Sequence, residues 1–165
     1  MDALTADKRA LAEQLNQVHA DLRAEAIAFP AQRRAIRPAP DEWCALELLG
    51  HIAEMHYSYV ARAENLIASP GAELGRDMQS PERLAAVDEG PSRSLEEALG
   101  RLDEARQHAL AFLDRLAPEE MTIAGNHRAL GPMTVRDVFA RTIVGHARNH
   151  LEQLRATRDQ VAARP

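Results

Sequence analysis

The feature that most constrains this 165-residue chain is the recurrence of apolar residues every three or four positions along several long stretches. A 3.6-residue period is typical of amphipathic α-helices and does not suit strands, whose side chains alternate. Ala, Leu, Arg and Glu, which are strong helix formers, dominate these stretches, whereas aromatic residues make up only 4% of the chain. The sequence therefore predicts an all-α fold.

Four segments carry this period over enough residues to form long helices. They are expected at about residues 4–28, 43–69, 94–116 and 134–162. In the first, the predicted core stripe consists of Leu4, Leu11, Leu15, Val18, Leu22 and Ile27. Four helices of this length predict a four-helix bundle that fills residues 1–165 as a single domain.

Two of the helix starts carry capping signatures. Ser94 is followed three residues later by Glu97, and Thr134 is followed three residues later by Asp137. In such a capping box, each side chain accepts a hydrogen bond from a backbone amide that the first turn leaves unpaired. These pairs therefore predict where the third and fourth helices begin.

Residues 70–93 separate the second and third helices and contain Pro, Gly and Ser, with one short helical patch near residues 81–87. This segment is too long for a tight turn, so it predicts a long crossover between the second and third helices, or alternatively a mobile lid. Within the second helix, Gly50 is expected to allow close approach by a neighbouring helix.

Charge and composition exclude several classes of partner. The chain carries a net charge of −5, and its arginines are scattered among acidic residues, so no nucleic acid is expected to bind. The start lacks the apolar core of a signal peptide, and no apolar run approaches the roughly 18 residues of a membrane span. A cytoplasmic protein without membrane contact is expected. The lone Cys44 excludes an intramolecular disulfide and a thiolate metal cluster.

Three histidines have the spacing of metal ligands. His146 and His150 lie four residues apart in the last predicted helix, so both project from one face. Their inward stripe is predicted to contain Val135, Val138, Phe139, Thr142, His146, His150, Gln153 and Leu154. Burying imidazoles is costly unless a metal or hydrogen bonds satisfy them, and both explanations stay open from spacing alone.

His51 adds a third nitrogen donor. It follows Leu48 and Leu49 inside an apolar stretch of the second helix, where an imidazole without a partner would be expensive. If it faces the other two, the three rings form a three-histidine site that leaves coordination positions for water or substrate. Zn²⁺ or Ni²⁺ is the expected ion, with Mn²⁺ or Fe²⁺ as alternatives.

Several separate segments resemble one known family. They are RP at 37–38, DEW at 41–43, LLGHIAE at 48–54, HRALGPMT at 127–134 and HARNHLEQL at 146–154. In this order and separation they resemble the DinB-like metal-binding four-helix bundles. That family includes YfiT-like metal-dependent hydrolases and bacillithiol-type or mycothiol-type S-transferases.

The resemblance implies more than the spacing does. Carried over by position, the ligand triad of the family falls on His51, His146 and His150. The resemblance also implies a homodimer and a reaction in which a low-molecular-weight thiol is transferred to a small electrophilic substrate, with hydrolysis as the variant. Many relatives have a carboxylate five residues after the first histidine, where this chain has His56.

Three further polar residues, His56, Glu54 and His127, are not expected to be primary metal ligands. His56 is a fourth ligand, a proton shuttle or, as we expect, a surface residue, because five residues turn a helix by about 140° from His51. Glu54 lies nearer the His51 face and is the predicted acceptor for a ligand or catalytic base. His127, in the loop before the last helix, is expected to meet solvent, with the mouth of the site as the alternative.

Four further residues are not expected to take part in chemistry. His19 and His108 have no partner at useful spacing. Trp43 is predicted to anchor the core rather than to form a ligand platform, and Cys44 has no neighbouring base in the sequence that would activate it.

Three functions are compatible with the sequence. The first is a metal-dependent thiol transferase or hydrolase, and the second is a non-catalytic module for stress response or detoxification that binds a metal or a small molecule. The third is a bundle without metal, in which the histidines are hydrogen-bonded to one another. An open coordination shell beside a cleft would favour the first, and the loops at 70–93 and 117–133 would select the substrate.

Overall fold

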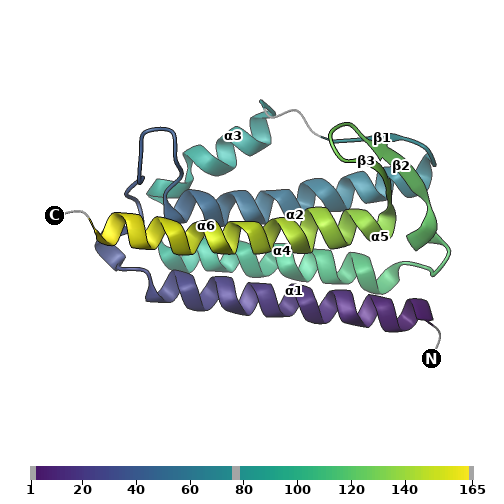
Figure 1. The fold of residues 1–165 in the computed structure, drawn as a ribbon, viewed down its shortest axis with the longest axis horizontal. Helices are drawn as coiled ribbons and strands as arrows, with labels where there is room; N and C mark the ends of the chain where they lie inside the picture. Colours follow the sequence, from purple (N-terminus) through teal and green to yellow (C-terminus); the bar gives the residue numbers. More distant parts are fainter. Residues whose placement is uncertain (1–2, 76–78, 164–165) are drawn as a thin grey trace.

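Four long helices lie side by side along the length of the protein (Figure 1). The structure is a computed structural model that describes residues 3–75 and 79–163. In this part of the chain the long helices are α1 (Ala3–Ala28), α2 (Ala45–Ala68), α4 (Leu95–Arg115) and a last helix formed by α5 (Val135–Asp137), the π-helical η4 (Val138–Val144) and α6 (Gly145–Ala162). The predicted four-helix bundle is confirmed, with the interruption by a π-helix as an addition.

The direction of the helices explains the long crossover. α2 and α4 run in the same direction, so the chain must return along the bundle between them (Figure 1). The return path contains β1 (Glu73–Leu74), α3 (Pro81–Asp88) and the 3₁₀ turn η2 (Gly90–Ser92). The predicted crossover between the second and third long helices is therefore confirmed, and α3 corresponds to the predicted helical patch.

Two glycines let the end of this crossover pack directly on α2. A Cβ atom added to Gly50 would lie 2.6 Å from the carbonyl oxygen of Ala86 on α3, and one added to Gly90 would lie 2.7 Å from the Cα of Glu47. The close approach predicted at Gly50 is confirmed. The C-terminal part of the crossover is a packed element of the fold, which does not suit the alternative of a mobile lid.

A small three-stranded sheet, which the sequence did not predict, covers one end of the bundle. Its order is β1, β2 (Ala124–His127) and β3 (Gly131–Thr134), with β1 parallel to β2 and β2 antiparallel to β3. Leu74 pairs with His127. Strands of two to four residues are too short to show an alternation of apolar and polar residues, so their sequences are typical of loops. Short 3₁₀ turns, η1 (Ala31–Arg33) and η3 (Glu120–Thr122), complete the described elements.

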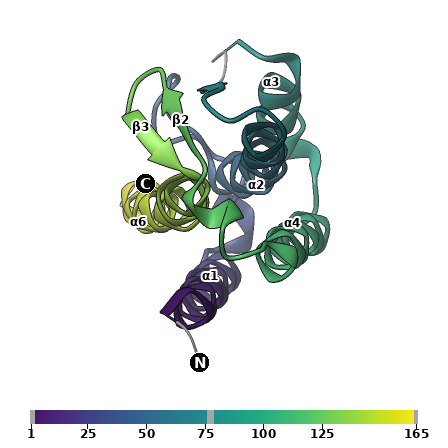
Figure 2. The same ribbon diagram turned by 90° about the vertical axis from the view of Figure 1, so that its right-hand side faces the viewer.

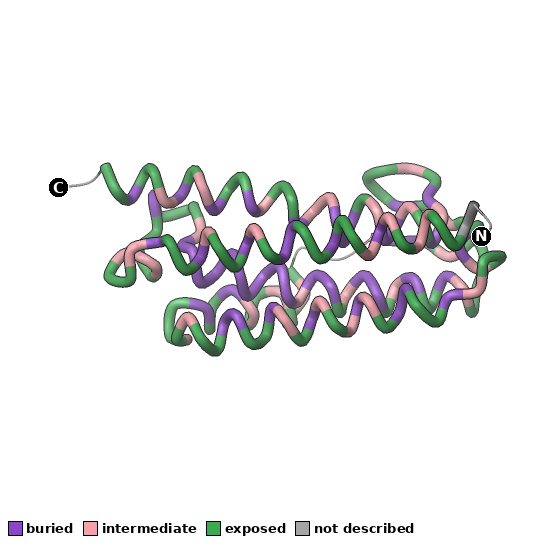
Figure 3. The backbone as a smooth tube through the Cα atoms, turned by 90° about the horizontal axis from the view of Figure 1, so that it is seen from below, coloured by how far each residue is buried: buried purple, intermediate pink, exposed green. Residues whose placement is uncertain are grey.

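The core stripe of α1 follows the predicted face with one correction. Leu11, Leu15, Val18 and Leu22 are buried, but Ile27 is 53% exposed and Ala26 takes the inward position. Leu22 and Ala26 are four residues apart, so Ile27 is turned about 100° away from the stripe. Figure 3 shows this alternation of buried and exposed residues along each long helix. The side chain of Leu4 lies outside the described part.

Both predicted capping boxes are present. The amide of Glu97 donates to Oγ of Ser94 over 3.1 Å, and the amide of Ser94 donates to a carboxylate oxygen of Glu97 over 2.7 Å. Thr134 and Asp137 form the equivalent pair, with distances of 3.0 and 3.1 Å. The predicted starts of the third and fourth long helices are confirmed.

The helix α2 lies at the centre of the arrangement, with α3, α4 and α6 around it (Figure 2). Of its 24 residues, 15 are buried, including Glu47, His51 and His56. Every polar group among them needs a partner, because an unsatisfied group in this position would destabilise the fold. No described helix has the length and apolar character needed to cross a membrane.

The contact at Gly50 generates a matched pair of predictions. Gly50→Ala forces a methyl group against the backbone of α3 and is expected to lower the free energy of unfolding by about 1–3 kcal/mol. Gly100→Ala, in the middle of α4 with open space around it, is expected to raise it by about 0.5–1 kcal/mol. Urea denaturation measures both, and an unchanged stability of Gly50→Ala would contradict the packing described.

Candidate metal centre

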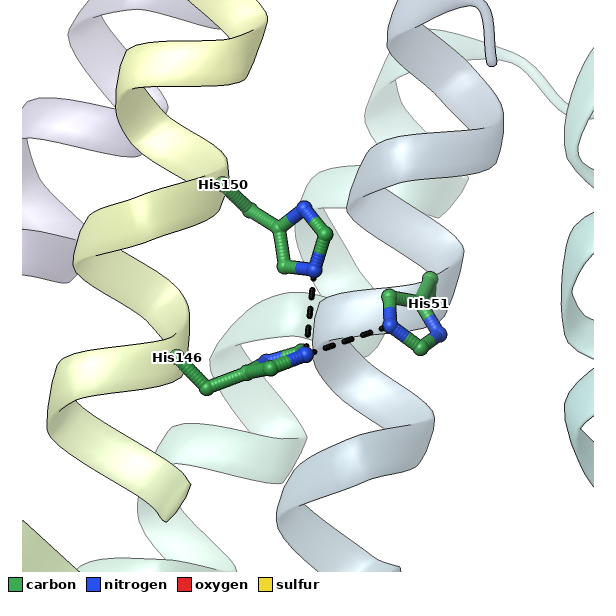
Figure 4. Close-up of side chains that lie close together, drawn as sticks. All are labelled: His51, His146 and His150. Carbon is green, nitrogen blue, oxygen red and sulfur yellow. Dashed lines mark hydrogen bonds between the residues drawn. The ribbon is translucent and has the colours of Figure 1, made fainter. Parts of the chain in front are cut away.

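Three imidazole rings from two helices converge at the contact between α2 and α6 (Figure 4). His51 extends from α2, and His146 and His150 extend from successive turns of α6. The Nε2 atom of His146 lies 3.3 Å from Nε2 of His51 and 3.0 Å from Nε2 of His150. One ligand atom of each residue lies within 4.8 Å of the other two. The structure thus brings together the three predicted ligands.

Hydrogen bonds alone do not account for this arrangement. A ring nitrogen of a neutral imidazole carries either one proton or one lone pair, so it completes one hydrogen bond. Nε2 of His146 faces two other Nε2 atoms at hydrogen-bond distance, and it can satisfy only one of them. The geometry therefore disfavours the reading in which the three histidines merely pair with one another.

A divalent ion fits the same distances. Zn–N bonds of about 2.0–2.1 Å separate two ligand nitrogens by about 2.9 Å in octahedral and about 3.4 Å in tetrahedral geometry. The observed separations of 3.0 and 3.3 Å lie in this range. Among the residues that the structure describes, no further His, Cys, Asp or Glu joins the group. Three nitrogen donors leave at least one coordination position to a non-protein ligand.

The protonation state of His150 suits a ligand. Its Nδ1 lies 2.8 Å from Oε1 of Gln153, so Nδ1 carries the proton and donates it to the amide oxygen. Burial lowers the pKa of His150, although the hydrogen bond that its ring donates to Gln153 opposes this effect. The ring is therefore neutral near pH 7, and its Nε2 presents a lone pair toward the other two histidines.

A π-helix precedes the ligands of α6. The amide of Gly145 donates to the carbonyl of Ala140, five residues earlier, and the hydroxyl of Thr142 donates to the carbonyl of Val138 over 2.5 Å. A π-helix holds more residues per turn than an α-helix, so each residue of η4 turns the chain through less than the 100° of an α-helix. Val138 and Thr142 of this segment are buried, and His146 follows in α6. The predicted inward stripe is buried at Val135, Val138, Phe139, Thr142 and Leu154.

Trp43 forms a wall of the site, a role that the sequence did not predict. Its ring centroid lies 4.6 Å from that of His51 and 6.1 Å from that of His150, and it also packs against the core as expected. The guanidinium of Arg83 on α3 lies 5.2 Å from the Trp43 ring. The crossover helix is thus linked to the histidines through one indole. The position of Trp43 just before α2 was the only signal in the sequence for this role.

Glu54, the predicted acceptor or base, faces a different space. It lines a cleft of about 1130 Å³ between α2, α3 and α4, together with Gly50, Tyr57, Arg93 and Glu97, and none of the three histidines lines that cleft. The role assigned to Glu54 from the sequence therefore stays a prediction.

His56 and His19 correct two predictions. His56 was expected at the surface but is fully buried, and His19 was expected to lack a partner but lies with its Nε2 2.8 Å from Nε2 of His56. The signal was present, because His19 is four residues after Leu15 and His56 four after Ile52. Both histidines therefore continue the apolar faces of their helices.

His127 is also buried, contrary to the expectation that it meets solvent. Its Nδ1 accepts hydrogen bonds from the amides of Ala129 and Leu130, both over 3.1 Å, so its Nε2 donates to the hydroxyl of Tyr59 over 3.2 Å. Burial lowers its pKa, and the ring ties the β2–β3 turn to α2. Its role is to hold the hairpin.

Cys44 behaves as the sequence predicted. It is fully buried at the start of α2, and burial raises the pKa of its thiol to about 11. Such a thiol stays protonated and is a poor nucleophile at neutral pH.

Comparisons with known proteins agree with the fold. The family model of the DinB superfamily matches residues 14–154. A solved structure of YfiT from Bacillus subtilis, described as a probable metal-dependent hydrolase with an unusual four-helix bundle topology, is similar with a TM-score of 0.74 and 15% identity, over 94% of this chain and 87% of that chain. An uncharacterized protein from Clostridium difficile 630 is similar with a TM-score of 0.69 and 16% identity, over 90% and 94%. No curated protein matches the chain.

The buried histidine pair makes the stability of the metal-free protein sensitive to acid. Burial, reinforced by Arg106 and opposed by Asp103, lowers the pKa of His19 from 6.5 to about 4. Between these pH values the unfolded chain binds a proton that the folded chain does not, so stability is complete above pH 6.5 and falls as the pH drops. His19 alone should account for roughly 3 kcal/mol of this loss.

Denaturant titrations from pH 7 to pH 4 on chelator-treated protein measure the loss. His19→Gln, which has no group titrating in this window, should show a smaller acid loss than the unchanged protein. An equal loss in both would contradict the assignment to His19.

Proposed function

The chain belongs to the DinB superfamily, and on this basis we propose that it is a metal-dependent enzyme acting on a small electrophilic molecule. The proposed reaction is transfer of a low-molecular-weight thiol to that molecule, with hydrolysis as the variant. The observation that carries the proposal is the convergence of the Nε2 atoms of His51, His146 and His150 at distances suited to one ion.

The proposed ligands are supported by chemistry as well as by distance. Three neutral imidazoles add no negative charge, so the positive charge of the ion stays available to attract an anionic ligand such as a thiolate. When bound, a divalent ion acts as a Lewis acid and lowers the pKa of a coordinated water or thiol. Zn²⁺ or Ni²⁺ is the proposed ion, and Mn²⁺ or Fe²⁺ are the alternatives.

The surrounding residues support catalysis at this position. The Trp43 ring covers His51 and His150 on one side and keeps water from that side of the ligands. Gln153 holds the ring of His150 in the tautomer that presents Nε2. Because both anchoring helices are packed in the bundle, the ligand directions are fixed before any substrate arrives.

A second candidate is a non-catalytic module that holds a small molecule. The cleft of about 1130 Å³ below α3 favours it, since it is large enough for such a ligand and is not lined by the three histidines. A ligand that binds there without turnover would support this candidate.

A homodimer and a cytoplasmic location are part of the proposal for either function. Analytical ultracentrifugation tests whether the protein is a dimer.

The proposed metal site predicts one bound ion per chain. Chelator-treated protein reloaded with Zn²⁺ or Ni²⁺ should contain one equivalent by elemental analysis, and His150→Ala should lose most of it because one of three donors is gone. The loaded protein should convert thiol and electrophile pairs faster than His150→Ala does. Equal rates in the two proteins would reject the catalytic role.

The contact between Gln153 and His150 predicts a smaller effect. Gln153→Ala removes the acceptor that fixes the His150 tautomer and should weaken metal affinity about 10–100-fold. Gln160→Ala, which changes an exposed glutamine two turns further along α6, is the matched control and should bind as the unchanged protein does. A competition titration with a chromophoric chelator measures both affinities.

A further inference from the structure

Two buried histidines, one on α1 and one on α2, meet in the core of the bundle. His19 on α1 and His56 on α2 are 6% and 0% exposed, and their Nε2 atoms lie 2.8 Å apart. Their ring centroids are 5.0 Å apart. This is the separation of a direct hydrogen bond between two imidazoles, one of which donates and the other accepts.

The pair connects two sides of the bundle. His19 lines a surface pocket of about 300 Å³ between α1 and α4, together with Asn16, Asp103 and Arg106. The proposed metal site lies between α2 and α6, and Figure 2 shows these helices on the opposite side of the bundle from the α1–α4 groove. His56 is on the same helix as His51, about 7.5 Å further along its axis and about 140° around it, where it contacts His19 of α1.

The electrostatic surroundings agree with this placement. Burial lowers the pKa of His56 well below its usual value, and the imidazoles of His19 and His146 lower it further. Around His19, Arg106 acts against protonation and Asp103 in favour of it. Both imidazoles are therefore neutral near pH 7, and a proton that reaches His19 is readily released to water in the pocket.

Structural packing alone does not require these rings. Two apolar side chains of similar volume would fill the same space without the cost of burying polar nitrogens. An imidazole, by contrast, has two nitrogens on different edges and can accept a proton at one while it releases a proton from the other. A hydrogen-bonded pair of such rings is suited to conduct protons.

We propose that His56 and His19 form a proton path that leads from the proposed metal site through the core to the pocket between α1 and α4. A proton that leaves the nucleophile enters the path through a water between the metal site and His56. His56 takes up this proton on one nitrogen and passes a proton from its other nitrogen to His19, and His19 releases one from its pocket edge to water. One proton enters the path at His56 and one leaves it at His19. The two rings then return to their original tautomers by exchange.

The path rests on the proposed function, but its first test does not depend on turnover. In protein labelled with ¹⁵N-histidine and loaded with Zn²⁺, long-range ¹H–¹⁵N spectra report the tautomer of each ring. A conducting pair populates both tautomers, so both nitrogens of His19 and His56 should give intermediate shifts. A single fixed tautomer at either ring would overturn the path, whether or not the protein has the proposed activity.

A second test uses variants in weakly buffered reactions. His19→Gln can still hydrogen-bond to His56 but cannot relay a proton, so kcat should fall at least tenfold with KM and metal content unchanged, and added imidazole should restore it. His19→Phe, which removes the hydrogen bond as well, should behave in the same way. An undiminished kcat for His19→Gln would overturn the path.

The matched control is His108→Phe, which removes a half-buried histidine of α4 that contacts Tyr57 and lies outside the path. Its kcat in weak buffer should equal that of the unchanged protein. An equal loss in this variant, not restored by imidazole, would assign the effect to general destabilisation and overturn the path.

Discussion

The burial of α2 is the constraint on which the rest of the structure depends. This helix is covered by neighbours around most of its circumference, yet it carries a carboxylate and two imidazoles in buried positions. Each is compensated by a partner from a different part of the chain: Glu47 by Arg37, His51 by the histidines of α6, and His56 by His19. The polar groups of α2 thereby fix which elements lie against it.

The pair of Arg37 and Glu47 illustrates how such compensation works. Burial raises the pKa of Glu47, but the hydrogen bonds from Arg37 and from the amide of Cys44 outweigh this effect, and the net pKa is lowered. The carboxylate therefore stays ionised while it caps α2 and holds the preceding loop. That loop ends in Trp43, so the same interaction positions the wall of the proposed metal site.

Much of the fold was available from local patterns in the sequence. Capping pairs such as Ser94 with Glu97 and the four-residue spacing of His146 and His150 act within one or two helical turns, so the sequence reveals them directly. The convergence of His51 on His146 and His150 depends on tertiary packing. It was inferred from the free-energy cost of burying an imidazole without a partner and from the family resemblance. His19 was assessed by its spacing to nearby partners, His56 by its rotation from His51, and His127 by its place in a loop. All three expectations were wrong because the partners of these histidines come from elements 37 or 68 residues away.

The π-helix of η4 has a consequence for how this segment tolerates change. Its wider turn accommodates residues between the hairpin and His146 that an α-helix of equal height would not hold. Removing one residue from 138–144 would let the segment relax to an α-helix, and the elements on both sides would keep nearly the same alignment, because the wider π-helical turn already absorbs about one additional residue. The stretch therefore tolerates the gain or loss of this one residue while the end of the bundle stays aligned with the ligands.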